Sequence, residues 1–99
     1  MLEFKNENNS LICMFKGRID TEAAMKIEDE LLDKVQHANM PVTFDFKDLE
    51  YVASSFLRTC VKTARIVGKE KLTVINSTRE ILHILEMTGF DKLMNIKKD

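Results

Sequence analysis

The chain has 99 residues, and 44% of them are hydrophobic, so it can hold one domain with one modest core and hardly two. A formal net charge of -1 and a pI near 6.1 give no overall field that would attract nucleic acid or an anionic membrane. The polar N-terminus lacks a signal-peptide pattern, and no window approaches the roughly 18 apolar residues of a membrane span. We therefore predict one cytoplasmic domain over residues 1–99, without nucleic-acid or membrane partners.

The first predicted element is a β-hairpin. Residues 2–6 and 11–16 flank a polar Asn-Glu-Asn-Asn turn and have the composition of short strands. Gly17 is expected to break the second strand.

A helix is predicted next. Asp20 or Thr21 can cap its first turn, and Asn39 with Pro41 ends it. Its apolar line consists of Ala24, Ile27, Leu31 and Val35. Another face of the same helix is acidic and carries Glu22, Asp29 and Asp33.

The most informative stretch, residues 41–62, changes from strand to helix within one short turn. Apolar residues alternate with polar ones up to Phe46, and from Leu57 onward they recur at helical spacing. Ser54 and Ser55 therefore stand in the first turn of a helix, where backbone N–H groups are unpaired and the helix dipole is positive. A serine at that place can cap the helix, bind an anion or carry a phosphate.

A basic stripe follows these serines. Arg58, Lys62, Arg65 and Lys69 are spaced four, three and four residues apart, opposite the apolar line of the helix. The simpler interpretation is a solvated face, and the functional one is a docking face for an acidic partner. Phe56 lies off the apolar line and is either folded over the sheet edge or exposed as an interface anchor.

The C-terminal third predicts a short strand over residues 72–75 and a last helix from about residue 78 to 87. Ser77 and Glu80 have the spacing of a capping box, and Gly89 ends the helix.

Residues 93–96 are predicted to add a final short strand. Strands that alternate with helices at this spacing predict a small α/β domain, with a mixed sheet of four or five strands and three or four helices.

Catalytic and metal sites find little support. His37 and His83 are far apart in sequence, and neither Cys13 nor Cys60 has a CxxC partner. Both cysteines fall in apolar patterns and are expected to be buried thiols of a reducing compartment. The sequence has neither a G-x-S-x-G elbow nor a Gly-rich phosphate loop. We predict no catalytic residue, no metal and no cofactor.

Acidic residues at strand ends are expected to surround the serine pair. Asp20, Asp45 and Asp48 fall at strand ends or strand–helix junctions, which gather on one rim of a layered α/β fold. A phosphate on Ser54 or Ser55 would then meet carboxylates as well as helix N–H groups. Repulsion across an interface would switch binding.

Three motifs stand in order along nearly the whole chain. A Gly-x-hydrophobic-Asp turn spans residues 17–20, an Asp-Leu segment leads to a Ser-Ser helix start over residues 48–55, and a Leu-x-x-x-Gly-hydrophobic-Asp-x-Leu pattern closes the chain at residues 85–93. Together they resemble the STAS domains shared by bacterial anti-sigma factor antagonists and the cytosolic tails of sulfate transporters. The resemblance implies a single STAS-like domain.

In switched antagonists, the resemblance implies phosphorylation of the second serine of an Asp-Ser-Ser-Gly-Leu motif, here Ser55. The kinase is itself the anti-sigma factor and an ATPase; it binds the unphosphorylated domain, which releases the sigma factor, and a phosphatase resets the modified form. This chain has Ala53 in place of the acidic residue and Phe56 in place of the glycine.

The leading prediction is thus a non-enzymatic anti-sigma factor antagonist that engages a serine kinase and is switched by phosphorylation. The predicted roles are phosphoacceptor for Ser55, helix cap for Ser54, site-shaping for Asp20 and Asp48, and partner contact for Phe56, Arg58 and Lys62. The alternative is a constitutive, unphosphorylated adaptor of a transporter ATPase or sensory complex, which the residues at 53 and 56 favour. A third class, an enzyme, would need a catalytic constellation that the sequence lacks. The sequence leaves open whether the domain self-associates, through an edge strand or through the basic helix.

Overall fold

The computed structural model describes residues 2–97 and contains one five-stranded sheet with three α-helices. In chain order the elements are β1 (Leu2–Glu7), β2 (Ser10–Ile19), α1 (Thr21–Ala38), β3 (Val42–Val52), α2 (Ser54–Val67), the 3-10 turn η1 (Lys69–Lys71), β4 (Leu72–Ile75), α3 (Arg79–Thr88), the 3-10 turn η2 (Phe90–Leu93) and β5 (Asn95–Ile96). The predicted small α/β domain with a mixed sheet is confirmed.

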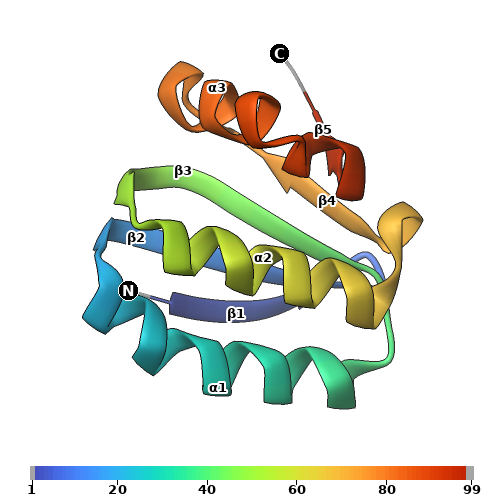
Figure 1. Ribbon diagram of the computed structural model, residues 1–99. Coiled ribbons are helices and arrows are strands. Elements are labelled where there is room, and N and C mark those ends of the chain that lie inside the picture. The colour runs from blue at the N-terminus through green and yellow to red at the C-terminus, as the bar shows by residue number, and fades with distance from the viewer. Residues whose placement is uncertain (1, 98–99) are drawn as a thin grey trace.

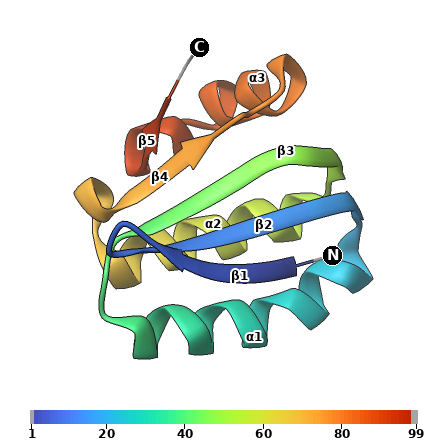
Figure 2. The same cartoon turned by 180° about the vertical axis from the view of Figure 1, so that it is seen from behind.

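The order of the strands in the sheet is the order of the strands in the chain (Figure 1). β1 is antiparallel to β2, and every later pair is parallel. Parallel strands are joined by right-handed crossovers, and crossovers that always step in the same direction place their helices on the same face. The helices accordingly share one core with the strands, and Figure 2 shows the strands seen from behind.

Alternate residues of the central strands form that core. Phe15 of β2 and Phe44 and Phe46 of β3 are almost completely buried. The Phe15 ring lies edge-on to Phe44 at a centroid distance of 5.1 Å and to Phe46 at 5.7 Å. The predicted apolar line of α1 is buried as well, namely Ala24, Ile27, Leu31 and Val35.

Turn residues with left-handed backbone conformations account for the hairpin. Asn8 and Asn9 have φ values of 53° and 63°, as the two central positions of a type I′ turn require. Gly17 does not end the second strand, which is where the sequence prediction was wrong. With φ of 81° it lies at a register irregularity between β2 and β3, and pairing continues to Ile19.

Helix ends agree with the sequence prediction at Asp20, Asn39 and Gly89. The Asp20 carboxylate accepts a hydrogen bond from the Ala23 backbone N–H at 2.9 Å, and Asn39 and Gly89 adopt the left-handed conformation after α1 and α3. The predicted capping box at Ser77 is wrong by one residue, because Thr78 is the residue that accepts from the first turn of α3. The final strand is shorter than predicted, since η2 occupies its first residue.

Candidate functional site at the start of helix α2

Neighbouring parallel strands fix the position of the serine pair. The Ala53 backbone N–H donates to the Ile19 carbonyl oxygen at 2.8 Å. β2 and β3 therefore end side by side, and α1 and α2 begin next to each other at the C-terminal ends of these strands. Asp20 therefore lies at the C-terminal ends of these strands, as predicted. Its carboxylate caps α1 there, which is a structural task of its own.

Ser54 does not cap α2, contrary to the prediction. The N-cap is Ala53, with an extended backbone at φ -81° and ψ 160° and no side-chain hydrogen bond. An N-cap residue lies outside the helix, and its side-chain oxygen accepts from the first turn. Ser54 is one residue too late for that role; it is the first helical residue and is exposed.

Ser55 faces a shallow hollow between α1 and α2. The hollow has a volume of about 200 Å³ and is lined by Ala24, Met25, Glu28, Ser55, Arg58, Thr59 and Lys62. The Ser55 Oγ atom is buried and makes no hydrogen bond to any residue in the range 2–97. Buried hydroxyl groups usually have a partner, so an unpaired one calls for an explanation such as a functional role.

Glu28 is the carboxylate that lies beside Ser55. Its Oε1 atom accepts a hydrogen bond from Thr59 Oγ1 at 2.8 Å and from Lys62 Nζ at 3.1 Å. Thr59 Oγ1 also lies 3.2 Å from the Ser55 carbonyl oxygen. The Thr59 hydroxyl, then the Lys62 ammonium, holds the pKa of Glu28 below its usual value, although burial acts in the opposite direction. The hollow thus contains a charged carboxylate contributed by α1.

Sequence reasoning missed both Glu28 and Thr59. Thr59 and Thr63 are almost fully buried although they are polar, and they stand one helical turn apart at the border of the apolar line. Buried polar groups need partners, so this pair was the available signal for a polar contact between α1 and α2.

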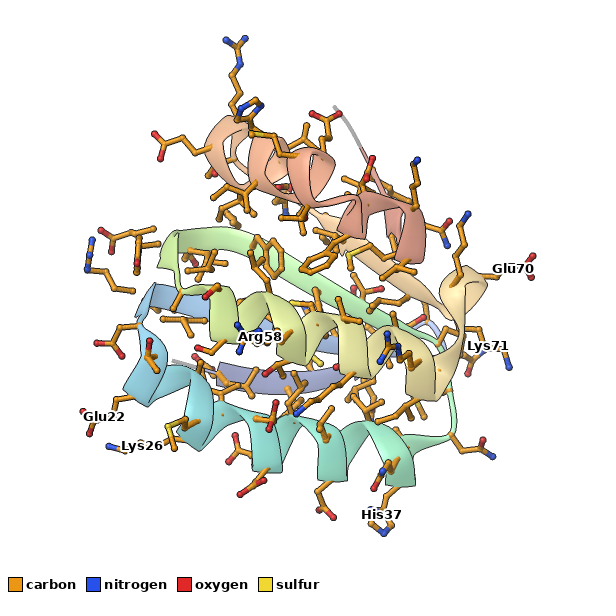
Figure 3. All side chains as sticks on the ribbon, viewed as in Figure 1. Glu22, Lys26, His37, Arg58, Glu70 and Lys71 are labelled. Atoms are coloured by element: carbon orange, nitrogen blue, oxygen red, sulfur yellow. The ribbon has the colours of Figure 1, made fainter. Side chains whose placement is uncertain are left out.

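The basic stripe is exposed, but only Arg58, Lys62 and Arg65 lie on α2; Lys69 follows the end of the helix and lies in η1, so its predicted place on the helix was wrong. Arg58, Arg65 and Lys69 are exposed and form no ion pair with another residue between 2 and 97. In Figure 3 the Arg58 side chain starts from the side of α2 that faces away from the sheet. Lys62 keeps 52% of its side chain exposed despite its contact with Glu28.

Phe56 is not an exposed partner contact, so that prediction was wrong. The residue is 0% exposed. Its ring lies 5.0 Å from the Phe15 ring and 6.1 Å from the Phe46 ring. On a helix the residue after Ser55 is turned by about a quarter of the circumference, which points Phe56 toward the sheet. This residue extends the core.

Asp48 is not brought to Ser55. It is exposed and pairs in register with Lys16, next to the buried Leu49, so it points to the sheet face opposite α2. The prediction failed because β3 continues four residues past Asp48 to Val52. Asp45 also serves elsewhere, since its Oδ1 atom accepts from Asn76 Nδ2 at 3.0 Å.

Other reactive side chains are inert or separate from this site. Burial raises the pKa of Cys13 to about 12 and raises the pKa of Cys60 further, and both thiols are free. Within residues 2–97 no His, Cys, Asp and Glu side chains cluster in a way that could hold a metal ion. No helix in the same range has the length and apolar character needed to cross a bilayer.

Comparison with known proteins identifies a matching family and solved structures with the same fold. Residues 6–95 match the family described as "Mlab, STAS domain". An anti-sigma factor antagonist from Mycobacterium paratuberculosis is 20% identical, with a TM-score of 0.87, and the alignment covers 100% of this chain and 86% of that one. No curated protein matches the chain by sequence.

Two further solved structures have the same fold. The Bacillus cell fate determinant SpoIIAA in its phosphorylated form has a TM-score of 0.74 at 14% identity, covering 100% of this chain and 93% of that one. A variant of RsbS from Moorella thermoacetica has a TM-score of 0.77 at 14% identity, covering 99% and 86%. These similarities confirm the fold that the three sequence motifs implied.

Proposed function

The chain belongs to the STAS domain family, and from this premise we propose that it is an anti-sigma factor antagonist. It binds its partner, an anti-sigma factor kinase, without catalysis of its own, through the outward surface at the start of α2. The observation that carries the proposal is the unpaired hydroxyl of Ser55 at the edge of a hollow bordered by Arg58 and Lys62. The hydroxyl group that would accept phosphate and an exposed basic surface lie together there.

Local electrostatics explain how phosphorylation of Ser55 would change this surface. A phosphoserine carries about -1.5 to -2 charges. At the first turn of α2 it would meet unpaired N–H groups, which favour an anion, and the cations Arg58 and Lys62. It would also compete with Glu28 for Lys62 and repel that carboxylate. The hollow would change from basic to acidic, which weakens binding of an acidic partner segment.

The Ser55 hydroxyl must become exposed before a kinase can transfer phosphate to it. The Oγ atom is buried, whereas the residue as a whole is half-buried. Rotation about χ1 moves a serine hydroxyl between staggered positions at low cost, so no unfolding of α2 is needed. SpoIIAA, which shares this fold, has been solved in both unphosphorylated and phosphorylated forms, and this supports a switch of the same kind, reset by a phosphatase.

A second candidate is a constitutive adaptor that is never phosphorylated, docked on a transporter ATPase or a sensory complex. Ala53 offers no carboxylate beside the serine, and the Ser55 hydroxyl is buried. These two observations favour it. Both candidates use the outward surface of α2, and they differ in the partner and in whether Ser55 is modified.

The test is a paired affinity capture from lysate of the native host, with wild type, Ser55→Asp and Ser54→Asp as baits. Ser54→Asp is the matched control, because it adds the same charge one residue earlier, on an exposed residue that does not line the hollow. Mass spectrometry identifies the captured proteins and maps phosphate on the native protein.

A kinase-type ATPase captured by wild type and by Ser54→Asp, but not by Ser55→Asp, together with phosphate on Ser55, would support the antagonist. Equal capture of one partner by all three baits, with unmodified Ser55, would contradict the switch and support the adaptor.

A further inference from the structure

The outer surface formed by α1 and α2 has an acidic half and a basic half. α1 and α2 lie side by side on the sheet (Figure 1), joined by the Glu28 contacts to Thr59 and Lys62. The outward side of α1 carries an acidic stripe, defined here as Glu22, Asp29 and Asp33. The outward side of α2 carries Arg58, Lys62 and Arg65 of the basic stripe. The two stripes run along parallel helices.

Pairing within the chain neutralises only part of these stripes. Lys26 lies 3.5 Å from Glu22, and His37 lies 3.4 Å from Asp33, in highly exposed contacts; Figure 3 shows Glu22 and Lys26 projecting from α1. Exposed pairs of this type contribute little. Asp29 forms no ion pair with another residue in the range 2–97. Each stripe therefore keeps charge that can act on another molecule.

Apolar side chains lie along the seam between the stripes. Met25 of α1 is 69% exposed and Ile66 of α2 is 39% exposed, and each lines a hollow between the two helices, at opposite ends of the seam. Leu32, one turn after Glu28 on the side of α1 that meets α2, is half-buried. An apolar centre with charged margins is the usual composition of a protein interface.

We propose that this face is the interface of a homodimer, which covers the same side of α2 as the proposed partner and therefore competes with partner binding. In a two-fold dimer the same surface is used twice, so it must be complementary to itself. A two-fold axis along the seam, parallel to both helices, places α1 of each copy opposite α2 of the other. Acidic and basic stripes then meet twice, and Met25, Leu32 and Ile66 of both copies lie along the axis.

The edges of the sheet are less suited to a second copy. β1 is an edge strand with exposed charges at Glu3, Lys5 and Glu7, and charged side chains are the usual protection against strand addition. The opposite edge, β5, has only two residues. Of the two surfaces that the sequence offers for self-association, the structure favours the helices.

Sedimentation velocity over a range of protein concentrations tests the homodimer. Exposed charge pairs are individually weak, so we expect a weak dimer that dissociates further as the ionic strength is raised to about 0.5 M, where the Debye length is only about 4 Å. Asp33→Lys places a positive charge in the acidic stripe, and Arg65→Glu places a negative charge in the basic stripe. In either variant the two facing stripes then carry some charge of the same sign. Each should weaken self-association by about fivefold or more.

An equimolar mixture of the two variants provides the decisive measurement. In the mixed dimer, one half of the interface keeps its native pairs, and the other half sets the introduced lysine opposite the introduced glutamate. The mixture should therefore associate about as well as wild type.

Arg79→Glu, the same charge change on the exposed first turn of α3, is the control that should leave association unchanged. Circular dichroism of each variant verifies its fold. A wild type that stays monomeric at every concentration, or a mixture that associates no better than its components, would overturn the proposal. A dimer that is indifferent to both substitutions would do the same and would move the interface to another surface.

Discussion

Ser55 and Phe56 are adjacent in the sequence but point about 100° apart around the axis of α2. The Phe56 ring packs against Phe15 and Phe46 in the core, whereas the Ser55 hydroxyl lies at a hollow edged by Arg58. The inward side of α2 holds the helix to the sheet, and the outward side presents charge to other molecules. Substitutions on the two sides should thus separate stability from binding.

The largest expected effect is on the inward side. Phe56→Ala should lower the free energy of unfolding by about 3–5 kcal/mol, because it leaves a cavity among the phenylalanine rings. Urea denaturation followed by circular dichroism measures this loss. Phe56→Leu keeps most of the volume and should cost less. A loss below about 1 kcal/mol for Phe56→Ala would mean that the ring is not part of the core.

An intermediate effect is expected at the boundary between the two sides. Thr59→Val keeps the shape of the side chain but removes the hydroxyl that donates to Glu28. It should cost about 0.5–1.5 kcal/mol at neutral pH. The pKa of Glu28 in the folded protein, lowered from 4.5, should rise toward that ordinary value in the variant, which an NMR titration of the carboxyl group measures.

The same contact gives a pH dependence of known sign. Because folding lowers the pKa of Glu28, its charged form stabilises the protein above the unfolded-state pKa, and this contribution is lost as the pH falls through the folded-state pKa. The stability difference between wild type and Thr59→Val should shrink over that acid range. Thr63→Val is the control, because the Thr63 hydroxyl donates to the Thr59 carbonyl oxygen and to no carboxylate. Its cost should not follow the titration of Glu28.

The smallest effect on stability is expected on the outward side. Arg58→Ala should change the free energy of unfolding by less than about 0.5 kcal/mol, since the side chain is exposed and unpaired within residues 2–97. Its affinity for the captured partner should fall by about fivefold to tenfold, as calorimetry with that partner would measure. Unchanged affinity would remove Arg58 from the proposed docking surface.

Local patterns in the sequence were enough to predict most of the fold. Asp20 at the start of α1, the turn at Asn8 and Asn9, and the alternation of Phe44 and Phe46 depend on neighbouring residues, and the structure confirms them. The lengths of β2 and β3 depend on pairing between the strands instead. The irregular register around Gly17 lets both strands continue, and no local signal predicts that.

The candidate site was harder to predict because it depends on helix phase and helix register. A shift of one residue decides whether Ser54 or Ala53 caps α2, and the phase of α2 decides whether Phe56 points inward or outward. The contact between Glu28 and Thr59 joins residues 31 positions apart. It exists only because β2 and β3 end together and set α1 beside α2, which is information that the pattern of one helix does not contain.

Strand order that follows chain order has a consequence for how the protein folds. Each strand pairs with the strand that precedes it in the chain, so each step closes a loop no longer than one crossover, at a modest entropic cost. The parallel pairings still join residues about 30 positions apart, such as Leu11 and Val42, so they form more slowly than the hairpin of β1 and β2. On a ribosome, α2 and its serines can pack on β2 and β3 before β4 has been synthesised, so the surface proposed for partner binding is complete before the last third of the domain exists.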